Sequence, residues 1–197
     1  LELCTKQEAN VQFTMADRKI NAVMSTSAGR LFDGVSAILG IRRKSTFEGE
    51  ASMALEFVAE EYQKNRLKNA KKMPEISTYE LLKEGNDRLL LNTGSLIKEI
   101  LYRRLNGEDS DRLAYIFHQE LARQITASCV KIREQSGCNK AALSGGVFQN
   151  RLLLELTDHM LKQQGFEVLK HQLVPPNDGG IALGQAVYAM AYLDRNK

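Results

Sequence analysis

The feature that most constrains the fold is an alternation of short apolar runs and helical patterns toward the carboxyl end of the chain. The segment "KAALS" predicts a short strand that is buried on both faces, and it is followed by Gly145-Gly146. "NRLLLELTDHMLKQQG" has the apolar spacing of a helix that ends at Gly165, and "FEVLKHQLV" predicts a second strand. A strand, a helix and a strand in this order form a right-handed parallel unit. The sequence therefore predicts an α/β fold in which helices pack on a mixed sheet.

Helical patterns also fill the chain before this unit. The apolar residues between Leu31 and Leu39 recur at helical spacing, and Gly40 ends the run. A second helix is predicted after a turn at Gly49. The residues that we expect on its apolar face are Met53, Leu55 or Ala54, Phe57 and Val58.

Two longer helices, a hairpin and a final helix complete the predicted elements. "TGSLIKEILYRRLNGE" is amphipathic, and "DRLAYIFHQELARQITASCVKIREQSG" predicts the longest helix of the chain. Gly85-Asn86 separates two short apolar runs, which is typical of a β-hairpin. The small residues of "IALGQAVYAMAYL" predict a thin final helix that packs close to its neighbours. Residues 1–20 and 62–76 are interpreted as connecting segments.

The composition favours a globular protein and argues against several classes of partner. Hydrophobic residues make up 43% and charged residues 26% of the 197 positions, which allows a sizeable core. The net charge of +3 is too small to predict a nucleic-acid or membrane partner, and no apolar run approaches the roughly 20 residues of a membrane span. Three cysteines without a CxxC spacing are typical of a reducing compartment. We therefore expect a cytoplasmic protein.

The three histidines suggest neither a metal site nor a catalytic triad made by this chain alone. They are widely spaced, with no His-x-x-x-His pair, and the sequence shows no histidine beside a serine or cysteine nucleophile. No residue is therefore assigned a catalytic role from the sequence.

Gly145-Gly146 is the first of three loops that could form one ligand site. A glycine pair after a strand allows a tight turn and leaves room for a ligand to approach the backbone. The helix that follows would offer unpaired N–H groups to a phosphate, and Asn150 near its start could face the ligand. The alternative is a plain tight turn in which Asn150 caps the helix.

The second loop is "PPNDGG", residues 175–180, which follows the second predicted strand. Its Asp178 stands where the last helix begins, and Gly179-Gly180 clears space beside it. Because both glycine loops follow parallel strands, we expect them at the same edge of the sheet, where open α/β sheets bind ligands. The alternative is that Asp178 only caps the last helix.

The third loop is "STSAGRLFDG", residues 25–34. Gly29 again lies between a polar loop and a helix, and Asp33 follows one turn later. The carboxylate of Asp33 could accept hydrogen bonds from the hydroxyl groups of a ribose. The alternative is that Asp33 only stabilises the helix, through the interaction of its negative charge with the positive end of the helix dipole.

Together these segments resemble one family. "STSAGRLFDGVSAILG", "FEGEA", "ALSGGVFQNRLL" and "VPPNDGGIALGQA" are similar, in this order, to the carboxyl-terminal part of HypF, the hydrogenase maturation carbamoyltransferases. The resemblance implies the second lobe of an actin-like ATPase domain of the ASKHA, ribonuclease H-like type. It also implies carbamoyl phosphate and ATP as substrates, carbamoyl adenylate as the intermediate, and the carboxyl-terminal cysteine of HypE as the acceptor.

The same resemblance implies roles for single residues. Asp33 would bind ribose, and Gly29 would lie in the same nucleotide-binding loop. Gly49 and Glu50 would line the sugar or phosphate side of the nucleotide. Three residues of the next loop would hold the nucleotide, namely Gly145, Gly146 and Asn150. Asp178 would be one ligand of a divalent metal ion (Fe, Zn or Mg), and the other ligands would lie outside this chain.

The chain departs from a complete family member in lacking the His-x-x-x-His pair and the other domains. We therefore expect a fragment, residues 1–197 being the second lobe, that is inactive alone. One alternative is a lobe of an O-carbamoyltransferase or of a tRNA threonylcarbamoyl-type transferase. Another is a nucleotide-binding module without catalysis.

Overall fold

The computed structural model describes residues 3–68, 82–84 and 88–195. In chain order its elements are α1 (Lys6–Asp17), α2 (Ala28–Ile38), α3 (Glu50–Lys68), β1 (Leu82–Glu84), β2 (Arg88–Leu90), α4 (Thr93–Leu105), α5 (Ser110–Ser136), β3 (Lys140–Leu143), η1 (Gly146–Gln149), α6 (Arg151–Gln163), β4 (Glu167–Lys170), η2 (Asp178–Gly180) and α7 (Ile181–Arg195). The order of the predicted helices and strands is confirmed. Among the described residues, no helix is both long enough and apolar enough to cross a membrane.

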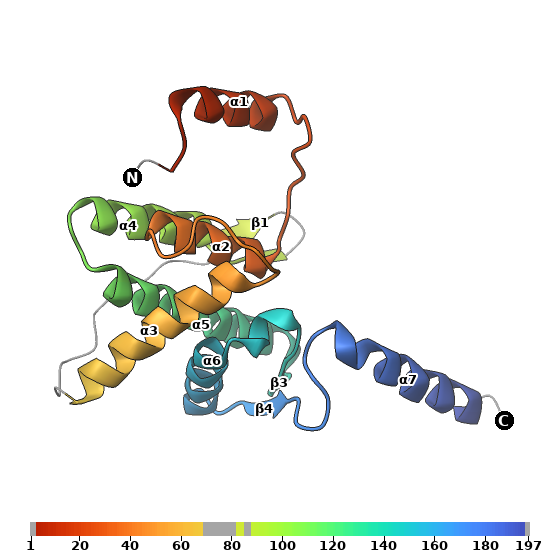
Figure 1. Ribbon diagram of the computed structural model, residues 1–197. Helices are drawn as coiled ribbons and strands as arrows, with labels where there is room; N and C mark the ends of the chain where they lie inside the picture. The colour runs from red at the N-terminus through yellow and green to blue at the C-terminus, as the bar shows by residue number, and fades with distance from the viewer. Residues whose placement is uncertain (1–2, 69–81, 85–87, 196–197) are drawn as a thin grey trace.

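The core is a layer of helices around α5, which packs against α3, α4 and α6 (Figure 1). Asp109 precedes this longest helix, and Gly137 ends it with a left-handed backbone. Burying a large apolar side chain contributes about 1.5–3 kcal/mol, so this layer supplies much of the stability. Its fully buried large side chains are Phe32, Leu39, Leu55, Leu96, Ile100, Leu113, Tyr115, Ile116, Phe117, Leu152 and Leu153.

The predicted apolar face of α3 was partly wrong. Leu55 is fully buried, but Met53 and Phe57 are 44% and 62% exposed. The buried face instead includes Ala51 and Ala59, one helical turn on either side of Leu55. The neighbouring helices thus cover the face of α3 that carries these small side chains, while the larger Met53 and Phe57 face outward.

The strands form two separate pairs within the described residues rather than one mixed sheet. β1 and β2 pair antiparallel, which confirms the predicted hairpin, and its turn at Gly85-Asn86 lies outside the described residues. β3 precedes α6 in the chain and β4 follows it, and the two strands pair in parallel, as predicted. The mixed sheet was wrong because no strand of the described chain joins the two pairs.

β3 is buried on one face only, which corrects the predicted burial on both. Ala141 and Leu143 are buried beside Leu161 and Phe166, whereas Lys140 and Ala142 are exposed. A strand alternates its side chains between two faces. Helix packing covers the first face, and nothing in the described chain covers the second.

The two ends of the chain lie apart from the helical core. α1 and α7 contain no buried residue, and Figure 1 shows both extending from the main body. The prediction that α7 packs close to its neighbours was therefore wrong for the described residues. The interpreted connecting segment 1–20 contains α1, and 62–76 begins inside α3, with residues 69–76 outside the described chain.

Candidate functional site

The structure brings the two glycine loops together. The parallel register pairs Leu143 with Lys170, so both strands end at the same edge. The amide of Gly145 donates a hydrogen bond of 2.8 Å to the carbonyl of Pro176. A Cβ at Gly146 would lie 3.9 Å from the Cβ of Asn177, which makes the two backbones close neighbours. We call residues 145–146 and 175–178 the loop pair.

Glycine is required at one position of this loop pair for conformational reasons. Gly145 has a φ of 100°, a region that L-residues with a side chain rarely adopt. This backbone turns the chain from β3 into η1 and directs the amide of Gly145 toward Pro176. The sequence prediction of a tight glycine turn after the strand is therefore confirmed.

A serine and a histidine meet beside the loop pair, which sequence reasoning missed. The Oγ of Ser144 lies 2.8 Å from the Nε2 of His171. Each residue directly follows its strand, and the register places the two ends side by side. The two residues are 27 positions apart, so only a prediction of the strand register could have found the pair.

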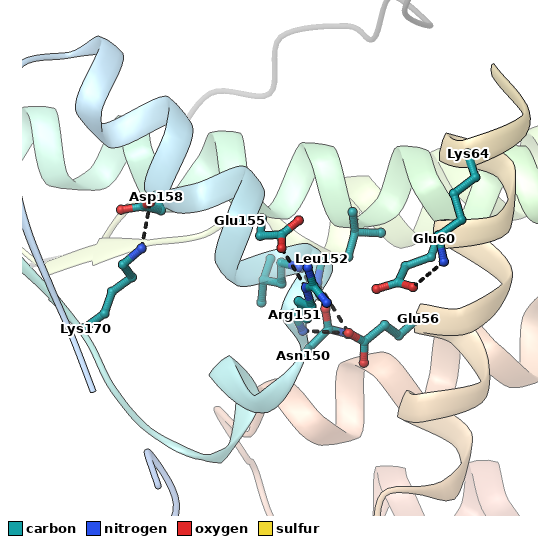
Figure 2. Close-up of polar contacts among 10 residues, drawn as sticks. Glu56, Glu60, Lys64, Asn150, Arg151, Leu152, Glu155, Asp158 and Lys170 are labelled. Carbon is teal, nitrogen blue, oxygen red and sulfur yellow. Dashed lines mark hydrogen bonds and ion pairs between the residues drawn. The ribbon is translucent and has the colours of Figure 1, made fainter. Parts of the chain in front are cut away.

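The start of α6 is already occupied by groups of the protein, contrary to the prediction of a free phosphate site. A carboxylate oxygen of Glu56, on α3, accepts hydrogen bonds from the amides of Arg151 at 2.6 Å and Leu152 at 3.3 Å. Figure 2 shows this carboxylate turned toward the first residues of α6. The Oδ1 of Asn150 accepts from the amide of Leu153 at 2.8 Å. These amides have no hydrogen left to offer to a phosphate.

Asn150 points into the core, which corrects the expectation that it faces an open cleft. It is 8% exposed, and its Nδ2 lies 3.0 Å from the Nε2 of His118 on α5. The Nδ1 of His118 lies 2.7 Å from the carbonyl of Ala114. Since a carbonyl only accepts, Nδ1 carries the proton and Nε2 accepts from Asn150. The alternative of a helix cap is confirmed, with a second bond that the sequence did not indicate.

Burial keeps His118 neutral. The histidine is fully buried, and its ring lies edge-on to Phe32 at a centroid distance of 5.3 Å. Desolvation lowers its pKa from 6.5 to about 4, and the hydrogen bond to Ala114 opposes this only partly. A neutral ring with one acceptor nitrogen suits the amide of Asn150.

Asp33 lies apart from the loop pair and joins α2 to α3. Its carboxylate accepts from the Oγ of Ser52 at 3.1 Å and pairs with Arg30 at 3.0 Å. The Asp33 side chain is 27% exposed. Among the described residues, no hydrogen bond or ion pair links Asp33 to either glycine loop. Gly29 lies in the first turn of the same helix.

Gly49 and Glu50 form the turn into α3. Gly49 has a φ of 82°, and Glu50 is only 8% exposed. The carboxylate of Glu50 accepts from the amide of Thr46 at 2.5 Å and pairs with Arg42 at 2.7 Å. The hydrogen bonds from Thr46 and the charge of Arg42 lower the pKa of Glu50, so the group stays ionised. This arrangement holds the loop before α3.

Asp178 by itself does not form a metal site. Asp178 is exposed and is the first residue of η2. The residue before it, Asn177, accepts a hydrogen bond of 3.0 Å at its Oδ1 from the amide of Gly179. The described residues contain no group of three or more His, Cys, Asp or Glu side chains that could hold a metal ion. A single exposed carboxylate does not hold a divalent cation. The described residues therefore do not complete a metal site, and Asp178 as one ligand of a metal held mainly by groups outside this chain stays a prediction.

Comparison with known proteins identifies the family. Residues 2–185 match the family model described as "Carbamoyltransferase, Kae1-like Domain, second subdomain". The "Probable carbamoyltransferase HypF" of Methanocaldococcus jannaschii is 35% identical over 180 residues, which are 91% of this chain and 21% of that protein. The "Carbamoyltransferase HypF" of Rhodobacter capsulatus is 36% identical over 184 residues, which are 92% of this chain and 22% of that protein.

A solved structure agrees with the sequence matches. The crystal structure of full-length HypF in the phosphate- and nucleotide-bound form matches with a TM-score of 0.83 and 36% identity. The match covers 98% of this chain and 24% of that one, so the chain spans only about a quarter of its length. The α/β fold of helices with a small parallel sheet is thus shared along almost the whole chain. The chain belongs to the HypF carbamoyltransferase family, in which it corresponds to the second subdomain of the Kae1-like domain.

Proposed function

We propose that this chain is the second lobe of an actin-like ATPase domain that carries out carbamoyl transfer. The complete protein would use carbamoyl phosphate and ATP, form carbamoyl adenylate, and carbamoylate the carboxyl-terminal cysteine of HypE during the maturation of nickel-iron hydrogenases. Membership in the HypF family supports the reaction class. Because the chain spans about a quarter of a solved relative, the activity belongs to the complete protein.

The observation that carries the proposal is the contact between the two glycine loops. The bond from the amide of Gly145 to Pro176 holds both loops at the carboxyl ends of two parallel strands. This edge is the usual ligand edge of an α/β sheet. Gly145 and Gly146 leave no side chain between a ligand and the backbone, which suits the approach of the carbamoyl adenylate.

The internal contacts at α6 refine the proposed roles. Since Glu56 and Asn150 occupy the first amides of this helix, the phosphate of the nucleotide would lie against the loop pair instead. Asn150 would position the loop from behind through its bond to His118. Asp33, whose side chain is partly exposed, would remain the group for the ribose hydroxyls, beside Gly29.

Other proposed contacts depend on parts outside this chain. Gly49 and Glu50 would line the sugar or phosphate side of the nucleotide, facing the first lobe. Asp178 would contribute one ligand to a divalent metal, with the remaining ligands from that lobe. We propose a cytoplasmic location, HypE as the protein partner, and no membrane or nucleic-acid partner.

Replacing Asp178 in the complete protein tests this proposal. The variant Asp178→Ala should fold normally, because the side chain is exposed, but should lose bound metal and slow carbamoyl transfer to HypE by about 10²-fold or more. Metal content, circular dichroism and the mass of the HypE carboxyl-terminal peptide measure these effects. Asp17→Ala, an exposed acid on α1, is the matched control.

Two outcomes would contradict the proposal. Unchanged transfer by Asp178→Ala would favour a module without a catalytic role. A wild-type protein that carbamoylates a sugar hydroxyl or a tRNA, and leaves HypE unmodified, would favour one of the other carbamoyltransferase branches.

A further inference from the structure

Ser144 and His171 form a polar pair at the end of β3 and β4 that no part of the proposed site has yet used. Their side chains lie 2.8 Å apart between Oγ and Nε2, and both residues are exposed. A serine and a histidine at this distance are the usual arrangement for passing a proton. Because both side chains are exposed, a reactant from outside the chain can reach the pair.

Three contacts fix the pair relative to the glycine loops. The register of Leu143 with Lys170 sets the spacing of the two strand ends. Lys170, the residue before His171, binds the carboxylate of Asp158 on α6 at 2.8 Å (Figure 2). On the other strand, the residue after Ser144 is Gly145, which is bonded to Pro176. The pair is thus held from both strands at the edge where the loop pair lies.

The chemistry of transfer requires a group that accepts a proton. A thiol that attacks a carbamoyl carbon must lose its proton, because the thiolate is the nucleophile. A neutral imidazole is suited to this role near pH 7. Among the described residues, the three cysteines do not take part in the loop pair, so the chain offers an acceptor for the proton there but no thiol, and the attacking thiol comes from the acceptor protein.

We propose that Ser144 and His171 form a proton-accepting pair for carbamoyl transfer, an inference that rests on the proposed function. With its own proton on Nδ1, His171 accepts the hydroxyl proton of Ser144 at Nε2. Ser144 in turn takes the proton of the attacking thiol. The sulfur–carbon bond forms, the bond from carbon to the adenylate oxygen breaks, and AMP leaves with the electron pair. The imidazolium then releases its proton to solvent.

The test uses the complete protein with carbamoyl phosphate, ATP and HypE as probes, and it measures two reactions separately. The first is carbamoyl-phosphate-dependent cleavage of ATP, and the second is the mass increase of the HypE carboxyl terminus. His171→Ala and His171→Asn should slow the second reaction by about 10²-fold or more and leave the first unchanged. Because His171 is exposed, added imidazole should restore much of the rate of His171→Ala.

Two further variants separate chemistry from structure. Ser144→Thr keeps a hydroxyl group and should retain most of the transfer rate, whereas Ser144→Ala should slow transfer about as much as His171→Ala. His159→Gln is the matched control, because His159 is an exposed histidine on the adjacent helix α6. It should transfer at the wild-type rate with or without imidazole.

The results distinguish failure of this inference from failure of the proposed function. A wild-type protein that does not carbamoylate HypE would remove the function itself. If wild type is active, then normal transfer by both His171 variants would overturn the proton-accepting pair. Slow transfer that imidazole does not restore, or equal loss in Ser144→Thr and Ser144→Ala, would also overturn it.

Discussion

At the scale of single residues, the choice of Asn at position 150 follows from its buried surroundings. Its side-chain oxygen accepts from Leu153, and its nitrogen donates to the neutral ring of His118. A carboxylate could make the first bond but not the second, because it has no hydrogen to donate. An aspartate here would be stable only with a charged imidazole, which burial disfavours. Asn150 thus has a structural role, because it joins the start of α6 to α5.

The neutral state of His118 predicts a loss of stability in mild acid. In the folded chain its pKa is lowered to about 4, whereas in the unfolded chain it is near 6.5. Unfolded molecules therefore bind more protons between these values, and stability falls as the pH drops from about 6.5 toward 4. The expected loss from this group is on the order of 3 kcal/mol. Urea unfolding at a series of pH values measures it.

A variant identifies the contribution of this histidine among all acid-sensitive groups. His118→Gln should be less stable at pH 7, but its free energy of unfolding should depend less on pH between 6.5 and 4. His159→Gln, on the exposed side of α6, should keep the wild-type dependence. Equal slopes for wild type and His118→Gln would show that the buried ring does not control this acid sensitivity.

At the scale of secondary structure, α3 connects the parts of the site. Its Ser52 binds Asp33 on α2, and Glu56, one turn later, binds the first amides of α6. Burial raises the pKa of Glu56, and the two amide hydrogen bonds oppose that change. The negative charge of the carboxylate also interacts favourably with the positive end of the α6 dipole. α3 therefore fixes the position of Asp33, the candidate for binding ribose, relative to the start of α6.

Removing the Glu56 carboxylate should weaken the contact between α3 and α6. Glu56→Ala leaves the amides of Arg151 and Leu152 without their acceptor, which should cost about 1–3 kcal/mol of unfolding free energy. Glu56→Gln keeps an acceptor oxygen and should cost less. Urea unfolding of the purified chain measures both changes.

Glu60→Ala provides the matched control on the same helix. Glu60 pairs with Lys64 at 3.1 Å, an i, i+4 pair whose lysine is largely exposed, so its loss should change stability by only about 0.5 kcal/mol or less. Figure 2 shows both acids along α3. A Glu56→Ala variant as stable as Glu60→Ala would mean that water replaces the carboxylate at α6 without cost.

At the scale of the whole molecule, the chain presents half of a proposed cleft. Most residues of the loop pair are exposed. α7 carries large apolar side chains at the surface, including Val187, Tyr188 and Leu193 at 57%, 74% and 62% exposure. A family model for a second subdomain matches most of the chain. In our proposal, the nucleotide and metal would therefore have contacts from this chain on one side only.

This incomplete cleft predicts that the 197-residue chain alone is inactive and binds nucleotide weakly. Isothermal titration with ATP or AMP should give a dissociation constant of about 1 mM or higher, since most of the binding contacts would be absent. No HypE carbamoylation is expected from the chain alone. Turnover of carbamoyl phosphate by it, or tight binding of ATP, would contradict the one-sided site.

The sequence by itself determined the elements that depend on neighbouring residues. Helical spacing predicted α2 to α7, and glycine turns predicted where β3 and α6 end, because both signals act over a few residues. The parallel arrangement of β3 and β4 also followed, since the helix between them permits little else. The family could likewise be recognised from four local motifs in order.

Only the tertiary structure decided which distant groups meet. The bonds of Asn150 to His118, of Glu56 to Arg151, and of Ser144 to His171 span 32, 95 and 27 positions. Such contacts depend on strand register and on the rotation of packed helices, which local preferences do not set. The same reason explains why Asn150 lies inside the core and why β3 is covered on one face only. Interactions between neighbouring residues determine which segments form helices and strands. Tertiary packing determines which side chains are buried and which distant groups they contact.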